Sequence, residues 1–244
     1  SRLKQISLKI KHDKYLWGLI AVCLIFTGFW IYLFAGYSTQ WAQDSHWHLT
    51  LSENFLSGKG YSFDGTTPHA KYPPGLAITM APLYLLLQNI EIAGLITLLL
   101  LSLGSLILCY KIGKLVNKKV ALISVILLAT HNLFIFNAFS IMTEIPFMFF
   151  SLLALYFFIE SFERRVYIIP SLLSAVLSIL IRYDGLFLIF PFLFYILVKR
   201  KEFDNFFFHK KTFIGIGLAT IFGAIWFTRN FIKFGSFLYT DYSR

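Results

Sequence analysis

Long apolar runs dominate the chain, and short polar segments separate them. Hydrophobic residues make up 57% of the chain and charged residues only 14%, whereas a soluble domain has about 45–50% and 25%. A helical span of a bilayer needs about 20 mostly apolar residues. Seven runs are predicted to span: 15–36, 93–113, 120–140, 146–162, 166–182, 185–198 and 212–228. The pattern predicts an all-α integral membrane protein, with 1–244 as one transmembrane module.

An eighth apolar stretch, 75–90, is ambiguous, and the distribution of Lys and Arg decides its placement. If it stays on the outer side as a re-entrant or interfacial helix, the inner segments contain 16 of the 22 Lys and Arg residues; if it spans, only 9 remain inside. Cytoplasmic loops are enriched in Lys and Arg, so the first arrangement is favoured. It predicts a multi-pass protein of the cell membrane with a cytoplasmic N-terminus and an outer loop 37–92 that holds interfacial helices.

The net charge of +10 by itself would fit nucleic-acid binding. The basic residues, however, lie in short clusters between apolar runs, where they orient spans and meet membrane lipid. We therefore predict no nucleic-acid partner. Cys23 and Cys109 lie inside apolar runs, so neither a disulfide framework nor a zinc site is predicted. The chain stops in an outer loop without a closing span, and we expect it to be truncated at its C-terminus.

The first outer loop carries candidate functional residues. It mixes Trp, Leu and Phe with Ser, His and Glu, which is typical of a helix at the membrane surface, and Gly58 and Gly60 would end that helix. Asp44, at its start, could act as a general base toward a hydroxyl group held at the interface. Capping of the helix is the alternative reading of Asp44.

Two histidines follow Asp44 directly. Asp44 and His48 are four residues apart and share a helical face, the spacing at which two ligands can meet one metal ion. No third ligand is identifiable, so a divalent metal is left open and no other cofactor is predicted. Interfacial polar residues are the plainer reading of the pair. We predict that His46, His48 and Tyr72 contact the substrate.

The remaining outer charges lie beside the ends of spans. Lys71 opens the sequence KYPPG, where a cation at the headgroup level could pair with a phosphate of an amphiphilic substrate, or could snorkel. Glu144, between the third and fourth spans, is either functional or a helix cap. Arg182 and Asp184 of RYDG could pair with each other. Together with Lys71 and Arg229, Arg182 gives three outer cations, which would suit a lipid-linked phosphate.

In this order the motifs resemble those of the GT-C membrane glycosyltransferases, in particular the protein O-mannosyltransferases and bacterial aminoarabinose transferases. The likeness consists of an acid just after the first span, then SGKGY, KYPPG, TE before the fourth span, RYDG and WFTRNFIKFGS, and it runs over nearly the whole chain. It implies a GT-C-like fold. It also implies transfer of a sugar, with inversion, from a polyprenyl-phosphate donor to a lipid, glycan or protein acceptor at the outer membrane face.

The resemblance also implies roles for individual residues. Asp44 takes the position of the general base and Glu144 that of the second acid. Lys71, Arg182 and Arg229 take the positions that bind the donor phosphate.

One departure concerns the first acid, and one alternative function stays open. The family often has an Asp-Glu pair where this chain has Asp44 followed by Ser45, so any metal-binding role of the second acid is in doubt. The alternative is a non-catalytic multi-pass protein, such as a transporter or flippase subunit or an assembly factor. Transporters place ionisable groups near mid-bilayer, whereas these charges gather at the outer edge, which favours the enzyme.

Overall fold

The computed structural model describes residues 13–36, 43–202, 208–237 and 239. Apart from one isolated bridge between Ser62 and Pro68, the regular structure in these residues is helical, which confirms the predicted all-α class. The helices in chain order are α2 (Lys14–Gly36), α3 (Gln43–Leu56), α4 (Gly75–Leu87), α5 (Ile90–Gly113), α6 (Lys118–Ala129), α7 (Asn132–Phe139), α8 (Glu144–Ser161), η1 (Arg165–Tyr167), α9 (Ile168–Ile181), η2 (Tyr183–Leu188), α10 (Ile189–Val198), η3 (Arg200–Glu202) and α12 (Lys210–Phe234).

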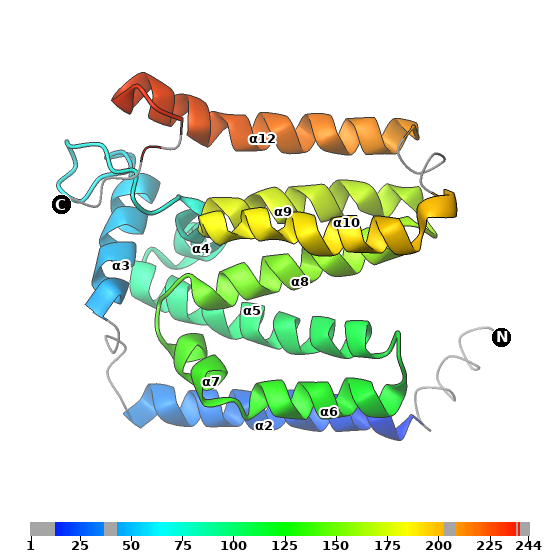
Figure 1. The fold of residues 1–244 in the computed structure, drawn as a ribbon. Coiled ribbons are helices and arrows are strands. Elements are labelled where there is room, and N and C mark those ends of the chain that lie inside the picture. The colour runs from blue at the N-terminus through cyan, green and yellow to red at the C-terminus, as the bar shows by residue number, and fades with distance from the viewer. Residues whose placement is uncertain (1–12, 37–42, 203–207, 238, 240–244) are drawn as a thin grey trace.

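The long helices lie side by side along one common direction, and α3 lies across one end of them (Figure 1). That end, called the α3 end below, also carries the loop 57–74, the start of α8, the turn between α9 and η2, and the last turns of α12. The turns from α5 to α6 and from α8 to α9 lie at the opposite end, together with the end of α10 and the start of α12. Residues 1–12, and with them most of the predicted cytoplasmic N-terminal segment, lie outside the described residues.

Four helices are each long and apolar enough to cross a membrane: α2, α5, α8 and α12. A fifth span results if α6 and α7, which are bent by 61° at their junction, count as one. The two other predicted spans are the shorter apolar helices Arg165–Ile181 and Tyr183–Val198. Helix α4 has 13 residues and is about 20 Å long at 1.5 Å per residue, less than the bilayer core of about 30 Å. The fold is therefore that of a multi-pass membrane protein, and seven spans stay a prediction.

Local sequence signals set several helix ends. The side chains of Asn89 and Asn117 accept hydrogen bonds from backbone N–H groups of the first turns of α5 and α6, both at 2.9 Å. Gly58 and Gly60 follow α3 with φ values of 80° and 86°, a conformation that disfavours residues with a Cβ atom. The glycines thus end α3 as predicted.

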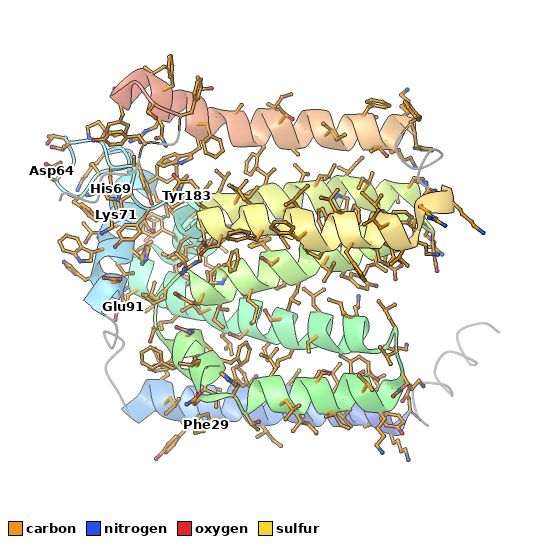
Figure 2. All side chains as sticks on the ribbon, viewed as in Figure 1. Phe29, Asp64, His69, Lys71, Glu91 and Tyr183 are labelled. Atoms are coloured by element: carbon orange, nitrogen blue, oxygen red, sulfur yellow. The ribbon has the colours of Figure 1, made fainter. Side chains whose placement is uncertain are left out.

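The buried side chains form three separate hydrophobic clusters. A large cluster of aliphatic and aromatic side chains lies among α2, α4, α5, α6 and α7, and a second cluster, with Phe158 stacked on Phe192 at 4.1 Å, joins α8, α9 and α10. A third cluster joins α3, the loop 57–74, α4, α9 and α12 at the α3 end: Leu51, Tyr61, Ala77, Leu180 and Trp226. Phe29 and many other large apolar side chains point outwards (Figure 2), as expected for surfaces that face lipid.

Candidate active site

A cavity of about 630 Å³ opens at the α3 end between α3, the loop 57–74 and the residues around the end of α12. Two carboxylates, two ammonium groups and several aromatic rings line it. Its lining consists of Asp44, Trp47, Phe63, Asp64, Thr67, Pro68, His69, Ala70, Lys71, Tyr72, Lys233, Phe234 and Tyr239. Figure 2 shows Asp64, His69 and Lys71 together at this end. Small-molecule sites typically enclose roughly 300–1,000 Å³, so the cavity is large enough for a sugar and part of a second substrate.

Asp44 lies in the first turn of α3, its side chain is exposed, and it borders the cavity. Helix α3 begins at Gln43, so Asp44 is inside the helix and does not occupy the capping position before it. The positive end of the helix dipole stabilises a carboxylate there. The structure thus provides a carboxylate that is open to a substrate in the cavity.

His48, one turn after Asp44, is buried and 5% exposed. Its ring lies 4.7 Å from that of Tyr72. Burial lowers the pKa of His48 to about 4, opposed by the field of Asp44 and assisted by that of Arg182, so the imidazole is neutral at pH 7. His46 points outwards instead. Among the described residues, no group of three His, Cys, Asp or Glu side chains is placed to hold a metal ion.

The loop 57–74 is held by its own side chains. Asp64 accepts hydrogen bonds from the backbone N–H groups of Thr66 and Thr67 at 2.8 and 2.7 Å, and these bonds keep the pKa of its carboxyl well below the ordinary value. His69 Nε2 accepts a hydrogen bond from the backbone N–H of Tyr72 at 3.2 Å. The Lys71 ammonium lies 5.3 Å from the centre of the Tyr72 ring. Lys71 therefore reaches the cavity from a loop with a defined shape.

Arg229 fastens this loop to α12. Its Nη1 donates to the His69 carbonyl at 2.8 Å and to Asn230 Oδ1 at 2.9 Å, and its Nη2 donates to the Tyr61 carbonyl at 3.5 Å. Tyr61 is buried, which raises the pKa of its phenol strongly, and its hydroxyl donates to the Pro73 carbonyl at 3.0 Å. Arg229, predicted as a phosphate ligand, thus donates hydrogen bonds to the backbone of the loop.

Arg182 lies between two carboxylates. Its Nη1 donates to Glu144 Oε1 at 2.8 Å and to Thr143 Oγ1 at 3.3 Å, and its Nε donates to Asp184 Oδ2 at 3.1 Å. The predicted pairing with Asp184 is confirmed, and Glu144 is the first residue of α8 rather than its cap. One cation and two carboxylates leave the group with a negative formal charge, which is unfavourable for a phosphate. Glu144 Oε2 is buried and has no hydrogen-bond partner among the described residues.

The structure therefore separates residues that the sequence grouped together. Asp44, Lys71 and Tyr72 line one cavity, whereas Arg182 and Arg229 are not among its lining residues. Lys233 also lines this cavity and was not among the residues predicted from the sequence. The sequence feature that could have revealed Lys233 is its position one helical turn after Arg229 in WFTRNFIKF. The rings of Trp47, Phe63 and Phe234 were missed as well, because the surface of a membrane protein is rich in aromatic residues whatever its function.

Residues 71–227 match the family model described as dolichyl-phosphate-mannose-protein mannosyltransferase. The match covers more than half of the chain, so the chain belongs to this family of membrane glycosyltransferases, which use a polyprenyl-phosphate-linked sugar as donor. The predicted GT-C resemblance is thereby confirmed. Neither the curated proteins nor the solved structures contain a match to the chain. Asp44, Arg229 and Lys233 lie outside the matched residues.

Proposed function

We propose that the chain transfers a sugar from a polyprenyl-phosphate donor to an acceptor hydroxyl in the cavity at the α3 end, on the outer face of the membrane. Asp44 acts as the general base, and Lys71 and Lys233 bind the donor phosphate. The proposal rests on one observation above all: the exposed carboxylate of Asp44 and the two ammonium groups line the same cavity. A base for the acceptor and cations for the leaving group are what this transfer requires.

The chemistry follows from these positions. The acceptor oxygen attacks the anomeric carbon and gives its proton to Asp44. The bond between the anomeric carbon and the phosphate oxygen breaks, and its electron pair leaves with the polyprenyl phosphate. Lys71 and Lys233 stabilise the charge that develops on that phosphate, because preorganised cations act strongly where water is excluded. Attack opposite to the leaving group inverts the anomeric centre.

Other residues support the substrates in this proposal. The rings of Trp47 and Phe63, which meet at 4.7 Å, offer flat apolar surfaces to a sugar ring. Arg182 fixes the carboxylate of Glu144 at the start of α8. Arg229 is a positioning residue, because its hydrogen bonds to the loop determine where Lys71 lies.

The direct test is sugar transfer by the purified chain in liposomes that contain a polyprenyl-phosphate sugar donor. Asp44→Asn should lower kcat at least about 100-fold, the ordinary contribution of a general base. Asp64→Asn is the matched control: it changes the other carboxylate of the cavity, and asparagine can still accept the hydrogen bonds of the turn, so activity should stay within about threefold. An Asp44→Asn variant with wild-type activity would remove Asp44 as base. Absence of transfer by the wild type with every donor tried would favour the non-catalytic alternative.

Two further variants separate binding from positioning. Lys233→Met should raise the KM for the donor about tenfold, the loss of one charge-assisted hydrogen bond, and leave hydrogen exchange in the loop 57–74 unchanged. Arg229→Gln should instead speed the exchange of backbone amide protons in that loop, because the loop loses its attachment to α12. If Arg229→Gln raised the donor KM without any change in exchange, Arg229 would be a phosphate ligand, as its position in the family motif implies.

A further inference from the structure

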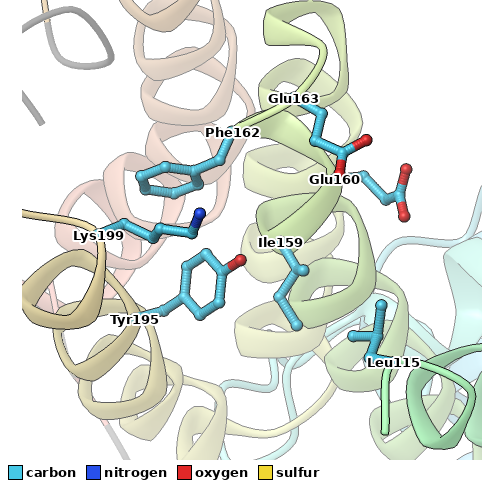
Figure 3. A pocket seen from close by; sticks show the side chains of 7 residues that line it. All are labelled: Leu115, Ile159, Glu160, Phe162, Glu163, Tyr195 and Lys199. Atoms are coloured by element: carbon cyan, nitrogen blue, oxygen red, sulfur yellow. The ribbon is translucent and has the colours of Figure 1, made fainter. Parts of the chain in front are cut away.

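A second cavity, of about 260 Å³, lies at the end of the bundle opposite to Asp44. It is formed by the C-terminal ends of α8 and α10 and by the turn that follows α5 (Figure 3). Its lining consists of Leu115, Ile159, Glu160, Phe162, Glu163, Tyr195 and Lys199. None of these residues has a part in the proposed transfer reaction, so the cavity calls for a separate explanation.

Acidic and basic side chains both line this cavity. Glu160, Glu163, Tyr195 and Lys199 all line it, and Figure 3 shows the Lys199 ammonium and the Tyr195 hydroxyl on one side of α8 and the two carboxylates on the other. The carboxylates come from α8 and the segment just after it, and the other two groups come from the end of α10. A ligand that matches this lining therefore carries both a positive group and a negative group.

The aromatic residues give the cavity a firm wall. The rings of Phe162 and Tyr195 lie 5.1 Å apart in an edge-to-face arrangement. Arg165 Nη1 donates to the carbonyl groups of Ser161 and Phe162, both at 2.8 Å, so this guanidinium fixes the end of α8. The backbone that carries Phe162 is thus held in place before any ligand binds.

The position of the cavity relative to the membrane indicates which ligand it binds. It lies where apolar helices end, and at that level in a bilayer the surrounding molecules are lipid headgroups. Leu115 is exposed at its edge, as are Phe194 and Leu197 on α10, so acyl chains have apolar surface to follow from the cavity into the membrane. Pockets between helix ends at this level are known to hold charged headgroups.

We infer that this cavity binds a phospholipid headgroup that contains a primary ammonium and a phosphate, as in phosphatidylethanolamine. The ammonium donates hydrogen bonds to Glu160 and Glu163, and the phosphate accepts them from Lys199 and Tyr195. A primary ammonium has three N–H donors, whereas the trimethylammonium of phosphatidylcholine has none. The glycerol headgroup of phosphatidylglycerol has no positive charge. The carboxylates should therefore select among lipids that share the same phosphate.

The test is native mass spectrometry of the whole chain, released from micelles doped with equal amounts of phosphatidylethanolamine, phosphatidylcholine and phosphatidylglycerol of identical acyl chains. The wild type should retain phosphatidylethanolamine at least about fivefold over the other two, since each hydrogen bond to a charged group favours binding about tenfold or more. In the double variant Glu160→Gln, Glu163→Gln this preference should disappear. Lys199→Gln should weaken retention of phosphatidylethanolamine and phosphatidylcholine alike and leave their ratio unchanged.

Glu53→Gln, an exposed change on α3 at the other end of the bundle, is the matched control and should keep the wild-type preference. Equal retention of the lipids by the wild type would overturn the inference, as would a double variant that keeps the preference. Glu163 is exposed, so the single variant Glu163→Gln should fold, and a reduced preference in it alone is expected if the double variant is unstable.

Discussion

Acidification should destabilise the protein through one buried side chain, His48. Burial lowers the pKa of His48 from 6.5 to about 4; the field of Asp44 opposes this, and that of Arg182 adds to it. Between these two values the unfolded chain binds a proton at this position and the folded chain does not. The free energy of unfolding therefore falls as the pH falls through this window, and the loss is complete below the folded pKa.

The size of the effect follows from the two pKa values. One pKa unit corresponds to about 1.4 kcal/mol. The contribution of His48 to the free energy of unfolding should thus fall by about 1.4 kcal/mol at pH 5.5 and by about 3 kcal/mol at pH 4. Native proteins are typically stable by only about 5–15 kcal/mol, so His48 alone removes a substantial part of the stability in mild acid.

The assay is denaturant-induced unfolding in detergent micelles, followed by tryptophan fluorescence at several values of pH between 7.5 and 4. Other groups titrate in this range too, so the quantity to compare is the pH dependence of the wild type minus that of His48→Gln, which cannot titrate. This difference should have the size and sign given above. His46→Gln is the control, since His46 lies exposed on the same helix. If His48→Gln has the same pH dependence as the wild type from 6.5 to 4, the reasoning is refuted.

Two further substitutions test the packing. In Gly75→Ala the new Cβ would lie 2.5 Å from a backbone carbonyl oxygen of α9, so α4 must shift, and thermal unfolding should show that the free energy of unfolding falls by about 1–3 kcal/mol. In the control Gly217→Ala the new Cβ has nothing within 4 Å, so the free energy of unfolding should rise by up to about 1 kcal/mol. Equal stabilities of the two variants would contradict the packing. Trp30→Phe removes the 2.9 Å hydrogen bond from Trp30 Nε1 to the Ala138 carbonyl and should cost about 1–3 kcal/mol, whereas the exposed Trp17→Phe should cost nothing measurable.

The hydrophobic pattern predicted the helices well, because a bilayer requires long apolar segments whatever their neighbours are. At 120–140 it predicted one span, and it did not predict the 61° bend between α6 and α7. No Pro or Gly marks the break. The polar residues Thr130 and His131 interrupt the apolar run there, and the hydrogen bond from Trp30 to Ala138 ties α7 to α2. The bend thus comes with a contact between helices, and the periodicity within one helix holds no information on such a contact.

The candidate site was predictable in its residue types but not in its partners. The position of these charges beside the ends of the apolar runs can be read from the sequence. Two contacts depend on how α8, α9 and α12 pack: Arg182 meets Glu144, 38 residues earlier, and Arg229 meets the carbonyl of His69. The position of Lys233 also depends on the fold. The sequence shows only a lysine near a helix end, and the fold places it in one cavity with Asp44.

The bond from Arg229 to His69 joins residues that are 160 positions apart, and this separation has a consequence during protein synthesis. Chains grow at about 5–20 residues per second. The ribosome therefore needs about 8–32 seconds after making the loop that carries Lys71 to reach Arg229 in α12. Until then the loop lacks its attachment, however well the earlier helices have inserted. A mutation that delays the insertion of α12 would therefore produce a protein with intact early helices and an unfinished cavity, and its defect would look like one in catalysis.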